Sequence, residues 1–247
     1  MNIQEIEPDE KICMKKYKFS CDTKTDGIPD PLPNVLRFSM AMIGKAGSGK
    51  TSLLMNLICK KGKIYNKKFD KVIVFSPSLR SMDDCPFDKL PEDQLYEELT
   101  AENLQGVIDE ITDSGEKILI IMDDVVNDMA KNAELQRLLC KLLMNRRHIA
   151  GYGGGISVII TSQVYNKIPC PIRKTFSHII LMNTKQKREL DTLYDEHILT
   201  EKKQFESICK YCYKDKFDFM YLDLEKPYDE VFHRNFNKLS MDLDKKC

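Results

Sequence analysis

Residues 44–51 read Gly44-Lys45-Ala46-Gly47-Ser48-Gly49-Lys50-Thr51, which matches the phosphate-binding pattern G-x-x-x-x-G-K-[ST]. The preceding residues 35–43 are mostly apolar and β-favouring, as in a buried strand, and the apolar positions of residues 52–59 suit a packed helix. Glycines let the backbone approach a phosphate closely, and the start of a helix presents unpaired N–H groups. The stretch therefore predicts binding of a nucleoside triphosphate together with Mg²⁺.

Two side chains of this stretch have predicted individual roles. Lys50 is expected to reach the β- and γ-phosphates, and the Thr51 hydroxyl is expected to ligate Mg²⁺. The alternative is a chance glycine-rich turn, which the strand and helix patterns on either side disfavour. The predicted nucleotide-binding residues are Gly44, Lys45, Ala46, Gly47, Ser48, Gly49, Lys50, Thr51 and Ser52.

Composition limits the classes of partner. The chain has 38 basic and 38 acidic residues, so a nucleic-acid partner must be met by a local basic surface rather than by overall charge. Residues 1–17 lack the apolar core of a signal peptide, and no apolar run approaches the roughly 20 residues that a membrane-spanning helix needs. We expect a soluble, intracellular protein with no membrane-spanning segment.

The nine cysteines are irregularly spaced, which favours reduced thiols over a disulfide framework. Cys209 and Cys212 form a single C-x-x-C pattern without a clear second ligand pair. Two thiols on a helix are therefore expected there in preference to a zinc site.

Strand and helix patterns alternate along the chain. Strands are predicted at 35–43, 71–76, 117–122, 156–161, 178–182 and 217–224. Helices are predicted at 101–114, with Thr100 as N-cap, at 132–148, and within 184–213. The alternation implies a mostly parallel sheet covered by helices on both faces, with the ligand at the carboxyl ends of the strands. The expected organisation is an N-terminal arm or edge element at 1–34, one ATPase domain at 35–225 and a C-terminal tail at 226–247.

Residues 118–124, Ile-Leu-Ile-Ile-Met-Asp-Asp, resemble a Walker B strand. An apolar run buries such a strand, and an acid at its tip holds Mg²⁺ directly or through water. Asp123 is the candidate for the metal, and Asp124 is the candidate general base for the attacking water. Many ATPases of this type have Glu at the second position, so the shorter Asp124 is an unusual base. The alternative is a solvated acidic turn after a buried strand.

Gln163 follows the apolar strand at 156–161. An amide on the strand beside the acidic pair could bond the γ-phosphate or orient the attacking water without adding charge. Thr161 and Ser162 are second choices for this sensor role. The alternative is a strand end whose polar side chains satisfy only the local backbone.

Arg146 and Arg147 end the helix predicted at 132–148. Cations are expected at a helix C-terminus on dipole grounds alone. The functional alternative is an arginine finger that stabilises charge on the γ-phosphate of a neighbouring subunit, which requires nucleotide sites at subunit interfaces. Arg173, which follows Pro169-Cys170-Pro171-Ile172, is a third candidate.

These patterns follow one another in a recognisable order. They are the phosphate-binding stretch, a strand ending in Asp123-Asp124, Asn145-Arg146-Arg147-His148, a strand ending in Thr161-Ser162-Gln163, and Ile168-Pro169-Cys170-Pro171-Ile172-Arg173. The series resembles the poxvirus-type genome-packaging ATPases of large DNA viruses and their virophages, in the FtsK–HerA superfamily of P-loop motors. The resemblance covers roughly residues 35–185 and is most specific between Arg146 and Arg173.

The resemblance implies a fold, an activity and partners. The fold is an α/β three-layer P-loop NTPase of the RecA/FtsK-like, additional-strand type. The activity is ATP-driven movement of double-stranded DNA, without sequence preference, into a preformed capsid by a homo-oligomeric ring. The partners are capsid or portal-vertex proteins, and the location is the viral factory in the host cytoplasm or the virion.

A motor needs cations that hold the DNA backbone without reading sequence. The candidates are Lys60, Lys61 and Lys63, the loop 152–155, and Lys185, Lys187 and Arg188. Lysine-rich surfaces are more often only solvated.

Two other functions remain open. A P-loop nucleoside or nucleotide kinase would share the phosphate-binding chemistry, but it needs an acceptor pocket and usually an arginine-rich lid, and the sequence shows no clear lid. A nucleotide-dependent virion assembly factor with little turnover is the second alternative.

Overall fold

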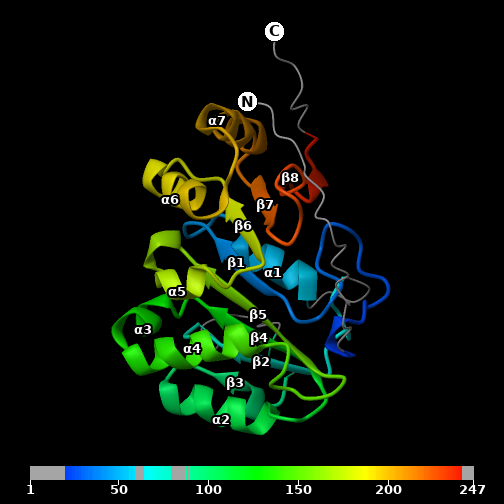
Figure 1. The fold of residues 1–247 in the computed structure, drawn as a ribbon. Helices are drawn as coiled ribbons and strands as arrows, with labels where there is room; N and C mark the ends of the chain where they lie inside the picture. The colour runs from blue at the N-terminus through cyan, green and yellow to red at the C-terminus, as the bar shows by residue number, and fades with distance from the viewer. Residues whose placement is uncertain (1–19, 59–63, 79–86, 88–89, 241–247) are drawn as a thin grey trace, which may run out of the picture.

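The computed structural model describes residues 20–58, 64–78, 87 and 90–240, and Figure 1 shows the arrangement of their helices and strands. Part of the predicted arm and tail, and the predicted DNA contacts Lys60, Lys61 and Lys63, lie outside the described residues.

The strands are β1 (Ser39–Ile43), β2 (Lys71–Phe75), β3 (Leu95–Tyr96), β4 (Lys117–Asp123), β5 (Gly155–Ser162), β6 (His178–Met182), β7 (Phe219–Asp223), β8 (Phe232–Arg234) and β9 (Asn237–Lys238). The α-helices are α1 (Lys50–Ile58), α2 (Ala101–Ile111), α3 (Val126–Lys131), α4 (Ala133–Asn145), α5 (Cys170–Arg173), α6 (Lys187–His197) and α7 (Lys202–Cys212). Short 3-10 helices are η1 (Ser20–Asp22), η3 (Glu92–Gln94) and η4 (Tyr165–Lys167).

The strands form one sheet in the order β3-β2-β4-β5-β1-β6-β7-β8-β9. β1 to β6 pair in parallel, and β7, β8 and β9 extend the sheet by antiparallel pairing. β5 lies between β1 and β4, which is the position of the additional strand in the predicted fold type. The sheet confirms the predicted mostly parallel α/β fold.

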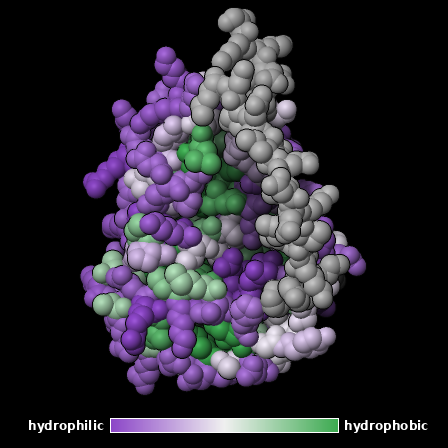
Figure 2. All heavy atoms as spheres, in the orientation of Figure 1, coloured by the Kyte–Doolittle hydropathy of each residue, from purple (hydrophilic) through white to green (hydrophobic). Residues whose placement is uncertain are grey.

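The core lies on both faces of the sheet, because the side chains of a strand alternate between faces. On β1, Met40 and Met42 join a cluster with Leu54 and Leu57 of α1, which also includes residues from the segment 28–38. Ala41 and Ile43 of the same strand join a second cluster that includes residues of α2 to α7. Three layers result. Hydrophilic residues dominate the outer surface in the view of Figure 2.

Helix ends follow the capping residues. The Thr100 hydroxyl accepts a hydrogen bond from Asn103 N at 3.0 Å, which confirms Thr100 as the N-cap of α2. The long helix predicted from residue 132 begins as α4 after Asn132, whose side chain accepts from Leu135 N at 3.1 Å. α4 ends at Asn145 rather than at residue 148. The short α3 and β3 are not in the sequence-based prediction, because six and two residues are too few to show a period.

The sheet continues past the boundary predicted at residue 225. β8 and β9 add two strands within the segment assigned to the C-terminal tail, and Phe232 and His233 of β8 are buried. Residues 232–238 of the predicted tail thus belong to the sheet. At the other end, β1 begins at Ser39 rather than at residue 35, and Val35 instead forms an isolated antiparallel bridge with Lys24. Segments this short show no alternation of apolar and polar residues in the sequence, so contacts with distant segments decide how they pair.

Candidate functional site: a nucleotide-binding cavity

The glycines of residues 44–49 allow a tight loop between β1 and α1. Gly47 and Gly49 have φ values of 71° and 96°, a backbone conformation that glycine adopts without a steric penalty. A Cβ atom at Gly44 would lie 2.6 Å from the Cβ of Met182 on β6, so only glycine fits there. A Cβ at Gly47 would meet no atom within 4 Å, so the outer side of the loop is open.

Lys50 begins α1 and is almost fully buried. Its ammonium donates to the carbonyl oxygens of Gly44 and Lys45 in its own loop. Burial lowers the pKa of Lys50 below its ordinary value, and the carboxylates of Asp124 and Asp123 oppose that shift. A desolvated ammonium beside an open loop is suited to bind an anion, because a phosphate would replace weak carbonyl acceptors with a charged one.

Asp123 lies at the carboxyl end of β4 and is 8% exposed. The Thr161 hydroxyl of β5 donates to its Oδ1 at 2.6 Å, and the Ser76 hydroxyl donates to its Oδ2 at 3.2 Å. Both carboxylate oxygens are thus oriented by neighbouring strands. This arrangement resembles the support that metal-ligating carboxylates receive in proteins.

Asp124 and Gln163 face each other across the ends of β4 and β5. The Gln163 amide nitrogen donates to Asp124 Oδ2 at 2.6 Å. Asp124 has a φ of 57°, and its N–H donates to the Thr161 hydroxyl at 3.1 Å. This left-handed conformation is uncommon for residues other than glycine, although Asp tolerates it better than most. The Asp124 carboxylate thus bonds Gln163, whereas the Asp123 carboxylate bonds Thr161 and Ser76.

These residues surround one cavity of about 360 Å³. It is lined by Ala46, Gly47, Ser48, Gly49, Lys50, Thr51, Ser52, Pro77, Ser78, Asp123, Asp124, Thr161 and Gln163. Sequence reasoning placed all of these residues at the site except Pro77 and Ser78, which follow β2. The hydroxyl of Ser76 bonds both Ser78 Oγ and Asp123, so serine after an apolar strand is the signal that could have located this wall.

The cavity fits the triphosphate and magnesium that the sequence predicts. The Ser48 hydroxyl is buried in the loop without a hydrogen-bond partner among the described residues. Loop N–H groups, the Lys50 ammonium and the Thr51 hydroxyl could hold phosphates and a hydrated Mg²⁺, with Asp123 as the acid that contacts the ion or its water. No cluster of three or more His, Cys, Asp or Glu side chains suited to a metal occurs in the described residues.

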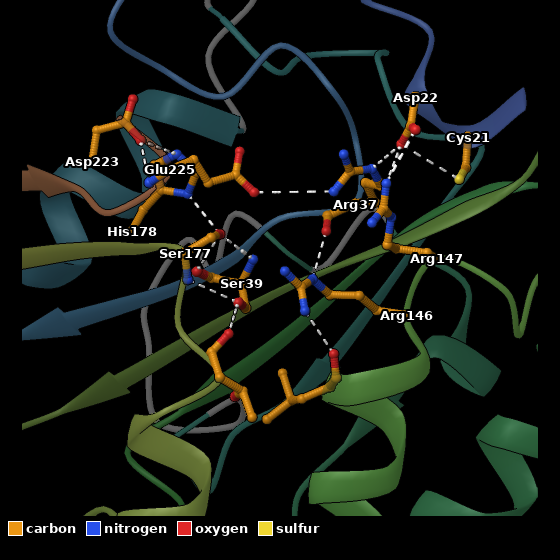
Figure 3. A network of polar contacts seen from close by, with 12 residues as sticks. Cys21, Asp22, Arg37, Ser39, Arg146, Arg147, Ser177, His178, Asp223 and Glu225 are labelled. Atoms are coloured by element: carbon orange, nitrogen blue, oxygen red, sulfur yellow. Dashed lines mark hydrogen bonds and ion pairs between the residues drawn. The ribbon is translucent and has the colours of Figure 1, made fainter. Parts of the chain in front are cut away.

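Neither Arg146 nor Arg147 lines this cavity. Figure 3 shows both side chains near Arg37, at the amino end of β1. Arg146 Nε donates to the Arg37 carbonyl at 2.6 Å and its Nη1 donates to Leu143 O at 2.7 Å. Arg147 Nη2 donates to both carboxylate oxygens of Asp22, at 2.9 and 3.1 Å, and Arg37 Nε contacts the same carboxylate. Within one chain these arginines are structural contacts, so their role as fingers remains a prediction about a neighbouring copy.

Arg173 is also paired within the chain. Its Nε donates to both carboxylate oxygens of Glu196 on α6, at 3.1 and 2.9 Å, and its Nη1 donates to Ile168 O at 2.7 Å. The guanidinium lies 5.3 Å from the centre of the Tyr165 ring. A finger role for Arg173 would require these contacts to open.

The remaining predicted features fall on two surfaces. The loop 152–155 lies at the amino end of β5, where Tyr152 is 93% exposed. Lys185 and Lys187 line a separate cavity of about 480 Å³ beside α6 and α7, and Arg188 is exposed next to them.

Cys209 and Cys212 lie on α7, as predicted, and both are buried. Burial raises the pKa of Cys209 to about 12 and that of Cys212 to about 11. Both thiols are therefore protonated at neutral pH. No helix in the described part of the chain combines the length and apolar character that crossing a membrane requires.

Comparisons with known proteins agree with this geometry. The NACHT domain family model matches residues 39–151. A search of curated proteins finds no match. The solved structures with a similar fold include the DNA-packaging ATPase B204 of Sulfolobus turreted icosahedral virus, with a TM-score of 0.56 and 15% identity over 83% of this chain and 98% of that chain.

Two further similar structures come from larger proteins. The pCW3 conjugation coupling protein TcpA, solved with ATPγS, has a TM-score of 0.50 and 13% identity over 86% of this chain and 63% of that one. The cytoplasmic domain of the Thermomonospora curvata type VII secretion ATPase EccC has a TM-score of 0.50 and 14% identity over 83% of this chain and 24% of that one. Identities this low show a shared fold. The family match covers less than half of this chain, so together with the shared fold it shows a P-loop NTPase fold and supports an ATPase, in agreement with the resemblance in sequence.

Proposed function

We propose that this chain is an ATP-hydrolysing motor that moves double-stranded DNA into a viral capsid. One observation carries the proposal. Lys50, Asp123, Asp124 and Gln163 line one cavity. They do so in a fold whose superposition covers 98% of the length of a viral DNA-packaging ATPase. A nucleotide-binding loop alone would fit many functions, but an acid pair with an amide bonded to it on the additional strand fits hydrolysis.

Each residue around the cavity has a role in this proposal. The loop 44–52 and Lys50 bind the phosphates, and Thr51 and Asp123 hold Mg²⁺, which supplies neutralisation of phosphate charge when bound. Asp124 accepts the proton of the attacking water. Gln163 orients the Asp124 carboxylate through their 2.6 Å hydrogen bond and positions the water. Gln163 adds no charge, so it does not disturb the acid pair.

The partners in this proposal follow from the task of a motor. Duplex DNA has a uniform phosphate backbone, so exposed cations can hold it without sequence preference. Lys185, Lys187 and Arg188 are the described cations that we assign to this contact, since all three are exposed on one segment after β6. Identical copies form a ring in which an arginine of one copy completes the site of the next, and capsid or portal-vertex proteins anchor that ring in the viral factory or the virion.

The test measures hydrolysis of Mg·ATP by the full chain with and without duplex DNA of unrelated sequences. We expect DNA of any sequence to raise the rate and added salt to reduce that rise, because salt weakens phosphate contacts. Lys50→Ala should abolish hydrolysis in both conditions. A monomeric protein whose hydrolysis ignores DNA would contradict the proposal, and phosphate transfer to an added nucleoside would indicate a kinase.

A charge-matched pair of variants tests the DNA surface. Replacing Lys185, Lys187 and Arg188 together by Ala should remove the stimulation by DNA and leave the basal rate. Replacing the exposed Lys131, Arg137 and Lys141 by Ala removes the same charge from α3 and α4 and should preserve stimulation. Equal behaviour of the two triple variants would refute the assignment of the surface.

A further inference from the structure

An exposed aromatic ring lies against the phosphate-binding loop. Phe217 is 60% exposed, although large apolar side chains are usually buried. A Cβ atom built on Gly49 would lie 3.4 Å from Cδ1 of Phe217, so the ring lies on the side of Gly49 where a side chain would be. The sequence-based prediction placed Phe217 at the start of the strand at 217–224 and gave it no part in ligand binding, whereas β7 begins at Phe219.

The turn that carries Phe217 is held by several hydrogen bonds. Asp218 Oδ2 accepts from the backbone N–H groups of Lys214 and Asp215, at 3.1 and 2.9 Å. The same oxygen accepts from Arg234 Nη2 of β8 at 2.8 Å. The Asn183 side chain donates to Asp215 O at 3.1 Å and so ties the turn to the end of β6. An exposed ring on an anchored turn is pre-organised for a contact.

The strand order sets the direction in which a bound nucleotide would extend. Asp124 and Gln163, the groups suited to the γ-phosphate, lie at the ends of β4 and β5 on one side of β1. β6 and β7 lie on the other side of β1 (Figure 1). Phe217 precedes β7 in the chain. A triphosphate with its γ end at the acid pair therefore directs its sugar and base toward the β6–β7 side of the loop.

We infer that Phe217 is the stacking platform for the purine base of the nucleotide, an inference that rests on the proposed binding of ATP at residues 44–52. Every base has a π-face, so a lone aromatic ring strengthens binding without selecting strongly among bases. The Lys216 ammonium lies 5.0 Å from the centre of the ring. Exposed cation–π contacts are weaker than base stacking, so a base can displace this lysine from the ring. GTP should therefore bind nearly as well as ATP.

Inorganic tripolyphosphate separates the base from the phosphates, because it lacks both sugar and base. In the presence of Mg²⁺, Phe217→Ala should weaken ATP binding by roughly tenfold, and it should leave tripolyphosphate binding unchanged. Phe217→Tyr should restore ATP affinity, because tyrosine also offers an aromatic face. Tyr228→Ala removes another aromatic that is 53% exposed and should affect neither ligand. Calorimetry on the full chain measures all of these affinities.

A fluorescence experiment gives an independent readout. The chain has no tryptophan, so Phe217→Trp introduces the only indole in the protein. We expect Mg·ATP to quench the tryptophan emission by stacking, while Mg·tripolyphosphate leaves the emission unchanged. Quenching by both ligands to the same extent would point to a movement of the loop and would overturn the stacking role.

The two experiments distinguish the stacking role of Phe217 from the proposed nucleotide binding on which it depends. Wild-type protein that binds neither ATP nor tripolyphosphate would overturn the proposed nucleotide site and the stacking role together. Wild-type protein that binds both ligands, with an ATP affinity unaltered by Phe217→Ala, would overturn only the stacking role. Because Phe217 is mostly exposed, the Ala variant should fold normally, and its unchanged tripolyphosphate affinity would verify that.

Discussion

The parallel strands begin at the amino edge of the sheet and end at its carboxyl edge. Each edge has a cluster of charged residues, but the two clusters differ in what their charges contact. At the amino edge, Asp22 accepts from Arg147 at 2.9 Å and from Arg37 at 2.5 Å, and Arg146 donates to two main-chain carbonyls. At the carboxyl edge, Lys50 donates to carbonyls of its own loop, next to a cavity of about 360 Å³.

The difference separates charges that hold the chain together from charges that can act on a ligand. The bond between Arg147 and Asp22 joins residues 125 positions apart, and the bond between Arg146 and Arg37 joins residues 109 positions apart. Lys50, in contrast, bonds residues only five and six positions away. A long-range contact stabilises the fold, since breaking it frees distant segments. A local contact beside a cavity leaves the ammonium available to a phosphate. The predicted effects of substitution follow from this contrast.

Lys50→Ala should produce the largest effect on activity. We expect hydrolysis to fall by at least about 100-fold, because the cation that would stabilise charge on the phosphates is removed. The free energy of unfolding should change by less than about 1 kcal/mol, since burying the ammonium already carries a desolvation penalty. Hydrolysis rates and urea unfolding measure the two quantities. A large loss of stability in Lys50→Ala would show that Lys50 also holds the fold together, which would contradict the difference between the two edges.

Gln163→Ala should reduce hydrolysis less, by up to about 100-fold, with nucleotide affinity nearly unchanged. The amide orients Asp124 rather than binding the bulk of the nucleotide, and misplacing a reacting group costs up to about that factor. Steady-state rates measure the effect on hydrolysis, and calorimetry measures the effect on nucleotide affinity. Gln136→Ala, on α4, is the matched control and should behave as wild type. Weaker ATP binding as the main effect would show that Gln163 holds nucleotide instead.

Arg146→Ala tests the amino edge. Two charged hydrogen bonds are lost, so we expect the protein to be destabilised by about 2–3 kcal/mol, with a melting temperature lower by roughly 4–12 °C. Hydrolysis per folded molecule should persist if Arg146 is structural. Lost hydrolysis at full stability, restored when Arg146→Ala is mixed with Lys50→Ala, would instead show a finger that acts on a neighbouring copy.

Asp218→Asn should have the smallest effect and refines the comparison, because Asp218 is a structural carboxylate at the carboxyl edge. Although burial opposes the shift, hydrogen bonds from Asn235 and Arg234 lower the pKa of Asp218 from 3.8 to about 2. A carboxylate with a lowered folded-state pKa stabilises the protein above its unfolded pKa, and this stabilisation is lost as pH falls through the folded value. The stability gap between wild type and Asp218→Asn should therefore be full at pH 6 and should narrow between about pH 4 and pH 2. Denaturant unfolding across this range measures the gap, and a gap independent of pH would contradict the assignment.

Local pattern predicted much of the fold and most of the cavity wall. The loop 44–51 and the apolar strand before Asp123 are contiguous, so their chemistry is visible in the order of residues. β8 and β9 were missed because strands of three and two residues show no period. Ser78 was missed because its place in the cavity depends on where β2 ends relative to β4.

The amino-acid sequence by itself determined the phosphate-binding loop, the alternation of strands and helices, and the acids and amide at strand ends. Only the tertiary structure decided that β5 lies between β1 and β4, which brings Gln163 to 2.6 Å from Asp124. It also decided that Arg147 pairs with Asp22 and that Phe217 lies beside Gly49. The physical reason is that glycine spacing and apolar periodicity act over a few neighbouring residues, whereas contacts between distant segments depend on how the whole sheet is ordered and packed.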